Sequence, residues 1–346
     1  MGLAGSLSYA IKAEARAMTR YLLRRALQAI PLLLLVSIAV FLLIEISPAD
    51  PLTLYEDNPD VTPEDILRLR ARLGLDEPVF VRYGKWLWHV LRGDWGTSHV
   101  TWRPALQEIA ELLPNTLYLM GTSFVATLLL AIPLGILSAT RQYSLLDHAI
   151  TAFALMWRSI PIFWFGLILI ILFHVTLRNP FTGAPLLPGG GMYDVRLRGT
   201  PGYAPILDYA RHLILPLTML TLFSAARYTR FMRSSMLEVI HQDYIRTAQA
   251  KGLSQRLTLY RHALKNAAIP LVTIMALDLP NLFGGALYTE TLFSWPGMGR
   301  LFLRSAERGD YAVLMALIMF NAALIVVCQL VADVIYAYLD PRIRFA

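Results

Sequence analysis

The chain has 346 residues, of which 56% are hydrophobic and 16% are charged, and its mean hydropathy is +0.51. One soluble core would not bury this much apolar surface, so the composition excludes a soluble globular protein and predicts an integral membrane protein. The net charge of +7 would also suit a nucleic-acid-binding protein, but the cations are spread over loops that flank apolar segments. No aromatic and basic surface of the kind that single strands need is present. We therefore expect a lipid bilayer around the chain and no nucleic acid.

The N-terminal part of the chain predicts one membrane helix. Residues 1–25 carry five Lys and Arg, and residues 26–46 form an apolar run. This run is long enough to cross a hydrocarbon core about 30 Å thick. A cleaved signal peptide is the alternative, but the run lacks a convincing small-residue cleavage site. We therefore expect a cytoplasmic segment over residues 1–25 and an uncleaved first helix over residues 26–46.

A polar segment over residues 47–113 follows this helix. Thr62 before Pro63 and two acidic residues is a typical helix start. Four tryptophans indicate an ordered piece near the membrane interface: Trp86, Trp88, Trp95 and Trp102. The segment predicts an extracytoplasmic insertion after the first helix, and packing on the outer membrane surface is one explanation of it.

Residues 114–346 contain five further apolar segments, each long enough to span the membrane. They are Thr116–Ala139, Ala149–Val175, Leu213–Met232, Ile269–Leu292 and Tyr311–Leu339. With the first helix they make six spans. We therefore predict an all-α integral membrane protein of six transmembrane helices, with both termini on one side.

The distribution of basic residues predicts which side this is. With the N-terminus inside, the inner segments hold 16 Lys and Arg against five acidic residues, and the outer segments hold 14 against 16. The basic counts alone differ little, but half of the outer ones lie in the long first loop, where charges orient a protein weakly. We therefore expect both termini and the loop over residues 233–268 to be cytoplasmic.

The loop over residues 233–268 predicts a helix, a glycine break and a second helix. Asp243–Lys251 lacks proline and is rich in Ala, Gln and Arg, so it favours a short helix that Gly252 ends in the left-handed conformation. Ser254 can cap the second helix. Apolar residues of that helix at i, i+3 and i+7 form one stripe: Leu257, Tyr260 and Leu264. An ordinary basic loop is the alternative, because Lys and Arg gather on cytoplasmic loops in any case.

The letters RTAQAKG in this loop resemble the coupling loop in permease subunits of binding-protein-dependent ABC importers. The signature of that loop is a Glu-Ala-Ala triplet with a glycine four residues later. Here the triplet is Arg246, Thr247 and Ala248, and the glycine is Gly252. This departs from the general form but is similar to the peptide branch, as are the stretches SIPIFWFG, ALYTETLFSWPGMGRLF and VADVIYAYLDPRIR. The resemblance covers nearly the whole chain, over residues 21–345.

The resemblance implies the type I ABC importer permease fold in a bacterial or archaeal inner membrane. The expected partners are a second homologous permease subunit, two ATPase subunits, an extracytoplasmic substrate-binding protein and a peptide substrate. Contact with that binding protein is a second explanation of residues 47–113. Relatives that look alike carry glutathione, nickel chelates or sugars, so these cargoes stay open.

The resemblance also implies a docking site for the ATPase. In that family, the helix before the glycine inserts into a groove on the ATPase subunit. The residues that we assign to this contact are Asp243, Tyr244, Arg246, Thr247, Ala248, Ala250, Lys251 and Gly252.

No motif in the chain indicates catalysis or metal binding. The seven histidines show no paired ligand spacing, and the single cysteine, Cys328, lies in an apolar run. The sequence contains no G-x-x-x-x-G-K-[ST] phosphate loop. We therefore expect no enzyme activity and no cofactor in this chain, with ATP and Mg²⁺ bound by the partner subunits.

Arg158 and Asp278 are ionisable residues inside the predicted third and fifth spans. Each lies about ten residues from the cytoplasmic end of its span, which at 1.5 Å per residue puts both about 15 Å deep. Members of the family look uncharged at both places. An ion pair between them is our hypothesis, because a lone charge there is costly. In the alternatives, Arg158 binds a peptide carboxylate, or each charge faces water separately. With Asn281 and Phe283 they form our candidate pathway set.

Two other classes of protein are the remaining alternatives. A secondary transporter or channel would show discontinuous helices and paired inverted repeats, and neither is clear in the sequence. An intramembrane enzyme would need a Ser/His, paired-Asp or HExxH arrangement at membrane depth, and the sequence has none.

Overall fold

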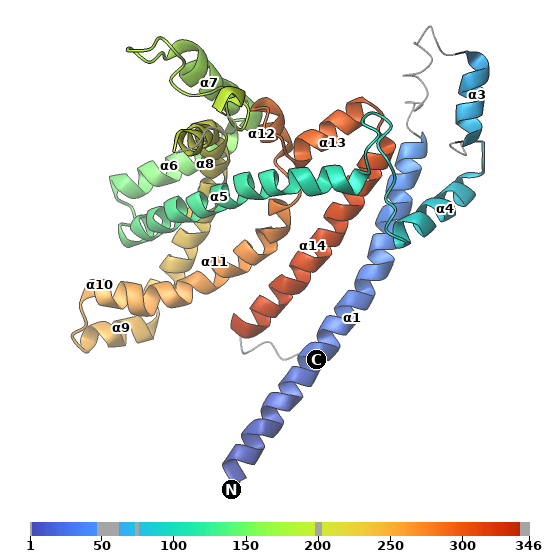
Figure 1. Cartoon of the computed structure of the whole chain (residues 1–346). Helices are drawn as coiled ribbons and strands as arrows, with labels where there is room; N and C mark the ends of the chain where they lie inside the picture. The colour runs from blue at the N-terminus through green and yellow to red at the C-terminus, as the bar shows by residue number, and fades with distance from the viewer. Residues whose placement is uncertain (1, 47–61, 73–75, 198–202, 340–346) are drawn as a thin grey trace. The chain divides into compact units, whose positions relative to one another are not determined.

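The computed structural model describes residues 2–46, 62–72, 76–197 and 203–339. Two parts of the predicted organisation, the start of the extracytoplasmic segment at residues 47–61 and the tail at residues 340–346, lie outside the described residues. The described chain is nearly all helical, and the only β-structure within it is isolated bridges (Figure 1). The predicted all-α fold class is therefore confirmed.

The described helices form two compact units, Met1–Glu111 with Phe302–Ala346, and Leu112–Leu301. The α-helices are α1 (Gly2–Ile46), α3 (Pro63–Arg72), α4 (Val79–Leu91), α5 (Ala105–Thr140), α6 (Leu145–Ser159), α7 (Ile162–Ile170), α8 (Ala204–Ile240), α9 (Asp243–Ala250), α10 (Gln255–Leu257), α11 (Leu264–Asp278), α12 (Leu287–Leu292), α13 (Met298–Glu307) and α14 (Tyr311–Leu339). Short π-helical or 3₁₀ segments adjoin them: η1 (Ile171–Thr176), η2 (Val195–Leu197), η3 (Thr258–Ala263) and η4 (Leu279–Leu282).

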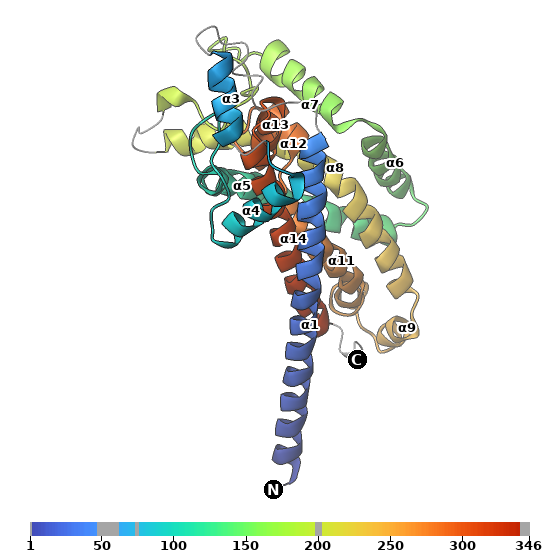
Figure 2. The ribbon, with the colours of Figure 1, turned by 90° about the vertical axis from the view of Figure 1, so that its right-hand side faces the viewer.

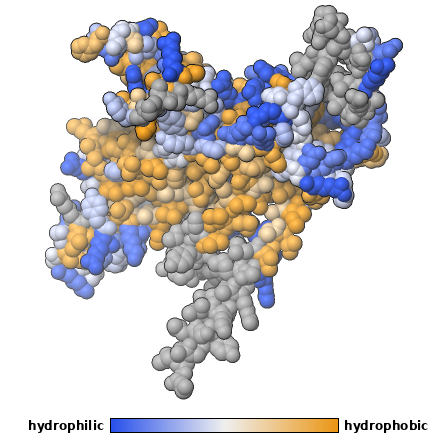
Figure 3. Space-filling model, viewed as in Figure 1, coloured by the Kyte–Doolittle hydropathy of each residue, from blue (hydrophilic) through white to orange (hydrophobic). Residues whose placement is uncertain are grey.

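Five helical segments of the described chain are long and apolar enough to cross a membrane, and there are six if the bent pair of α6 and α7 counts as one. Figure 3 shows apolar side chains gathered over α5 and α11, and hydrophilic ones at α9 and α10. Large apolar side chains such as Leu129 and Ile171 are exposed in the isolated chain. Apolar surface of this extent is covered by lipid or by another subunit. The chain is therefore a multi-pass membrane protein.

The predicted third span is broken rather than continuous. The chain bends by 98° between α6 and the segment formed by α7 and η1. The cause is Pro161, which has no N–H to continue the helix and forces the preceding residue out of the helical region. Ile160 accordingly has an extended backbone, with φ −85° and ψ 130°.

The fifth span lies closer to the N-terminus than the sequence predicts. We predicted Ile269–Leu292, but the continuous segment is Thr258–Leu282. The α-helix ends at Asp278, and Pro280 in the following 3₁₀ turn lacks the N–H of an α-helical bond. Asp278 therefore lies near the C-terminal end of this segment rather than about ten residues from its N-terminal end, as we predicted.

A buried carboxylate fixes the segment between α11 and α13 onto the beginning of α5. Glu290 of α12 is fully buried. Its carboxylate accepts hydrogen bonds from the Thr116 hydroxyl at 2.9 Å and from the backbone N–H groups of Arg300 at 3.1 Å and Ala286 at 3.3 Å. The polar letters in ALYTETLFSWPGMGRLF are therefore part of a packed structure rather than a loop exposed to solvent.

The first unit is built around α1 and α14, which run side by side (Figures 1 and 2). Arg25 lies 3.3 Å from Asp333 across this pair of helices. α4 rests against the end of α1, where the Tyr83 hydroxyl lies 2.8 Å from that of Ser37 and Arg82 lies 2.7 Å from Glu45. The sequence predicted α3 at its observed start, directly after Thr62.

The core of the second unit joins α5, α8, α9 and α11. Its buried residues are Ala131, Ile136, Ala139, Ala225, Tyr228, Met232, Met236, Ile245, Ala263, Ala267 and Leu271. α5 and α8 approach closely at Gly135, where an added Cβ would lie 2.5 Å from Met232 Cβ and 2.9 Å from the Thr229 carbonyl oxygen. A side chain at this position would push the two helices apart.

We expect Gly135→Ala to lower the free energy of unfolding by about 1–3 kcal/mol, the usual cost of overpacking a core. Gly121→Ala on the same helix is the matched control, because its Cβ would meet nothing within 4 Å. The control should be neutral or slightly stabilising. Thermal unfolding of the purified full-length protein compares the two variants. Equal unfolding midpoints would contradict the close packing of α5 on α8.

Candidate functional site

The coupling segment, residues 243–266, has the local structure that the sequence predicts. α9 covers Asp243–Ala250, and Gly252 follows it with φ +83°. Only glycine adopts this conformation without strain. Ser254 then caps α10, with its hydroxyl accepting a hydrogen bond from the Leu257 N–H. The predicted helix, glycine break and capped helix are confirmed.

One face of α9 packs on the core of its own chain. Ile245 is 2% exposed and Ala248 is 8% exposed, and Ile245 belongs to the core shared by α5, α8 and α11. The Tyr244 hydroxyl also accepts a hydrogen bond of 2.8 Å from the Asn266 amide. Ala248, which we had assigned to contact with a partner, therefore anchors α9 within this chain. Ile245 is not among the predicted contact residues, although it precedes Ala248 by three residues and so shares its face.

The opposite face of α9 is free of contacts with the core. The predicted contact residues that it exposes are Asp243, Tyr244, Arg246, Thr247, Ala250, Lys251 and Gly252. Arg246 and Asp243 lie 3.9 Å apart and both are exposed, so their ion pair adds little stability. α9 therefore presents a polar, weakly basic surface on one face, while its other face packs on the core (Figure 1).

Of the apolar stripe predicted for the second helix, Leu264 packs against the core of this chain, whereas the other two residues do not. Leu257 and Tyr260 are exposed, whereas Thr258 and Ala263 are buried. The reason is the π-helical turn η3, which has more residues per turn than an α-helix and moves later residues away from the stripe. The exposed apolar side chains add to the surface that α9 presents.

A buried ion pair that no motif in the sequence indicated holds the C-terminal part of α8 against its neighbours. Arg233 donates two hydrogen bonds of 2.8 Å to the carboxylate of Asp147, which is 2% exposed. The Ser138 hydroxyl of α5 and the Tyr143 N–H donate to the same carboxylate at 2.5 Å and 3.0 Å. The two residues are 86 positions apart, so no local pattern in the sequence connects them. This pair connects α5, α6 and α8 at one point.

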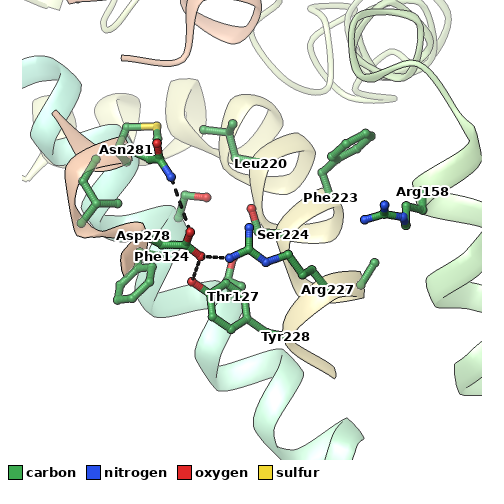
Figure 4. A pocket seen from close by; sticks show the side chains of 14 residues that line it. Phe124, Thr127, Arg158, Leu220, Phe223, Ser224, Arg227, Tyr228, Asp278 and Asn281 are labelled. Carbon is green, nitrogen blue, oxygen red and sulfur yellow. Dashed lines mark hydrogen bonds and ion pairs between the residues drawn. The ribbon is translucent and has the colours of Figure 1, made fainter. Parts of the chain in front are cut away.

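A pocket of about 310 Å³ lies near the middle of α5 and α8 and is also lined by residues at the ends of α6 and α11. It is lined by Met120, Ser123, Phe124, Thr127, Arg158, Leu220, Phe223, Ser224, Ala226, Arg227, Tyr228, Asp278, Asn281 and Leu282. Figure 4 shows the polar members around the cavity, with Arg158 reaching in from α6 and Asp278 from α11. Three members of the candidate pathway set are thus in one site, and Phe283 does not line it.

The ion pair in this pocket differs from the one that we predicted. Asp278 pairs with Arg227, and its carboxylate also accepts a hydrogen bond of 2.5 Å from the Tyr228 hydroxyl. Asn281 lies 3.5 Å from the second carboxylate oxygen. Arg158 makes no hydrogen bond or ion pair with any residue that the structure describes. The predicted Arg158–Asp278 pair is therefore wrong, because Arg227 already occupies the carboxylate.

Comparison with known proteins identifies the family. Residues 131–345 match the model of the binding-protein-dependent transport system inner membrane component, and residues 18–120 match the model of the N-terminal region of such components. The chain belongs to this family. The coupling segment lies within the first of these matches, as do the pocket residues that come from α6, α8 and α11.

Curated relatives of this inner membrane component match over nearly their whole length. The oligopeptide transport system permease protein AppB of Bacillus subtilis is 42% identical over 95% of this chain and 100% of its own. The dipeptide transport system permease protein DppB of Escherichia coli K12 is 35% identical over 94% of this chain and 99% of its own. A putative peptide transport system permease protein of Brucella abortus is 36% identical over 95% of this chain and 100% of its own.

The fold of this family member is also found in a solved transporter. The inward-facing MetNI methionine ABC transporter gives a TM-score of 0.51 over 68% of this chain and 97% of that one. Sequence identity is 17%, so the match shows a shared fold.

Removing one partner of the buried Asp147–Arg233 pair should lower the stability of the fold. We expect Asp147→Ala to lower the free energy of unfolding by about 3–5 kcal/mol, because it leaves the Arg233 guanidinium without its carboxylate. The double variant Asp147→Ala/Arg233→Met should recover a large part of this loss, because no unpaired charge remains. Thermal unfolding of the full-length chain measures both.

Arg246→Ala is the control for this experiment, since it removes an arginine from an exposed pair and should change the unfolding midpoint little. A double variant as unstable as the sum of its two single variants would contradict the coupling of Asp147 to Arg233.

Proposed function

We propose that this chain is the transmembrane permease subunit of an ATP-driven importer for di- and oligopeptides. The observation that carries the proposal is its identity of 35–42% to permeases named for peptide, dipeptide or oligopeptide transport, over 94–95% of the chain. The chain forms half of the translocation pathway, and a second homologous permease subunit forms the other half. A substrate-binding protein delivers the peptide, and two ATPase subunits bind ATP and Mg²⁺. The chain itself carries no cofactor and hydrolyses nothing.

The geometry of α9 supports this role. The surface on the exposed face of α9 docks in a groove of one ATPase subunit, while Ile245 and Ala248 hold the helix on the core. Because the core is close-packed, a movement of α9 carries α5, α8 and α11 with it. The pair of Asp147 and Arg233 extends the movement to α6. Closure of the ATPases thereby switches the pathway between its two openings.

We further propose that both termini and α9 face the cytoplasm of a bacterial or archaeal cell. The charge distribution supports this orientation, since the inner segments hold 16 Lys and Arg against five acidic residues. The same machinery carrying glutathione, a nickel chelate or an oligosaccharide is the alternative cargo assignment. A secondary transporter is a remote alternative, which the match to a binding-protein-dependent family disfavours.

Uptake by the reconstituted complex tests the proposal. The permease pair, the ATPases and the binding protein are placed in liposomes with internal ATP, and a mixture of peptides of two to five residues is added outside. Mass spectrometry of the vesicle contents should show ATP-dependent accumulation of peptides. Accumulation of glutathione, a nickel chelate or an oligosaccharide in place of any peptide would support the alternative cargo and overturn the peptide assignment.

The docking face of α9 can be tested separately. We expect Thr247→Trp to lower both binding-protein-stimulated ATP hydrolysis and uptake at least about tenfold, because loss of about 1.4 kcal/mol of contact energy has this effect. Thr247 is exposed, so the variant should fold normally. Arg196→Trp, at an exposed position away from α9, is the control and should leave both rates unchanged. Native rates in Thr247→Trp would exclude this face as the docking surface.

A further inference from the structure

The charges in the pocket between α5, α6, α8 and α11 do not balance. Among its lining residues are two cations, Arg158 and Arg227, and one carboxylate, Asp278. Asp278 is neutralised by Arg227 and held by the Tyr228 hydroxyl. The lining therefore carries one positive charge in excess, and it is located on Arg158.

A positive charge inside a membrane span requires either a partner or water. Arg158 is in the last turn of α6, beside the break at Pro161, and has no ionic or hydrogen-bonding partner in the described part of the chain. Figure 4 shows its guanidinium directed from α6 toward the cavity. A guanidinium in this position matches a carboxylate, which it can bind through two parallel hydrogen bonds.

A second polar group of the pocket is also unsatisfied. Thr127 of α5 lines the cavity and is 1% exposed, and its hydroxyl has no hydrogen-bond partner among the described residues. Buried hydroxyls normally have such a partner. A polar ligand, or water held with it, would supply one. The hydroxyl of Ser224 lines the same cavity and adds a further donor.

The remaining wall is apolar, and the cavity is small. Phe124, Leu220, Phe223 and Leu282 line the cavity between the polar groups. A volume of about 310 Å³ is at the small end of the range for ligand pockets, about 300–1,000 Å³. It accommodates one end of a peptide rather than a whole oligopeptide. The amino end is disfavoured, because the carboxylate that would bind an ammonium is already paired with Arg227.

We propose that this pocket is a transient binding site for the C-terminal carboxylate of the transported peptide, with Arg158 as the residue that binds it. This inference rests on the proposed function. Every linear peptide with an unmodified C-terminus has this group, so the site recognises a feature common to the cargo and does not depend on the peptide sequence. The apolar wall contacts the C-terminal side chain of the peptide. Asp278 neutralises the charge of Arg227, the second cation of the pocket.

Uptake of a peptide and its C-terminal amide separates this site from the binding protein. The peptide is the one that accumulates fastest in the reconstituted native complex, and it is used as free acid and as amide. We expect Arg158→Gln to lower uptake of the free acid about tenfold relative to the native complex, the effect of one lost charge-assisted pair. Uptake of the amide should be unchanged by this substitution. The native and the Arg158→Gln complexes contain the same binding protein. Its own preference for acid or amide therefore affects both complexes equally and cancels in the comparison between them.

Two further variants control this measurement. Arg158→Lys keeps the charge and should retain part of the uptake of the free acid. Arg230→Gln removes an exposed arginine of α8 that does not line the pocket, and should leave both uptake rates unchanged.

Chemical labelling provides a readout that does not require transport. Ser224→Cys places a thiol in the wall of the pocket, while the native Cys328 is buried. N-ethylmaleimide is added to the reconstituted complex without binding protein, and labelling of this chain is followed by mass spectrometry. The free acid of the peptide should slow the labelling, and its amide should not. With Arg158→Gln added, the free acid should lose its protective effect.

The outcomes distinguish the two levels of the proposal. Absence of peptide uptake by the native complex would overturn the proposed function and this inference together. Peptide uptake with an equal effect of Arg158→Gln on acid and amide, or with none, would overturn only the inference. An equal effect would indicate that Arg158 pairs with an acidic residue of the second permease subunit. Equal protection of the thiol by acid and amide would also overturn it.

Discussion

The constraint on which the structure depends most is that a carboxylate removed from water must have a partner. Asp147 meets it with Arg233, and Asp278 meets it with Arg227. In both cases the two partners come from different helices. The contacts that neutralise charge therefore also determine which helices are neighbours. Arg158 is the exception within the pocket: it is exposed and has no partner among the described residues, so a ligand carboxylate can reach it.

In the proposed function α9 transmits force, and its anchoring explains how a helix of eight residues would do so. An isolated helix of this length is not stable in water, so its structure depends on tertiary contacts. Ile245 and Ala248 supply these contacts, and Gly252 turns the chain back toward α11. The exposed face of α9 is therefore held in place because the opposite face is buried. A longer helix packed less firmly would bend before it moved its neighbours.

Local features of the structure were predictable from the sequence, whereas contacts between distant residues were not. The Pro63 start of α3, the glycine break after α9 and the full extent of α14 follow from capping residues and apolar length. The partner of Asp278 could not be found in this way, because it lies 51 residues away on α8. Pro161 indicates a kink beside the third span, but the apolar run on both sides of it gives no sign that the bend is as large as 98°. Burial of Ala248 depends on packing against α5 and α8, which no local pattern records.

The pocket and the coupling segment are physically connected through one residue. Tyr228 belongs to the same core as Ile245 of α9, and its hydroxyl holds Asp278 in the pocket. A displacement of α9 that shifts this core thus changes the position of Asp278 relative to α8. By reciprocity, a ligand that binds one arrangement of the pocket more tightly biases the position of α9 by the same free energy. In the proposed function, binding of the cargo and closure of the ATPases then act on one equilibrium, and no separate pathway between the two sites is needed.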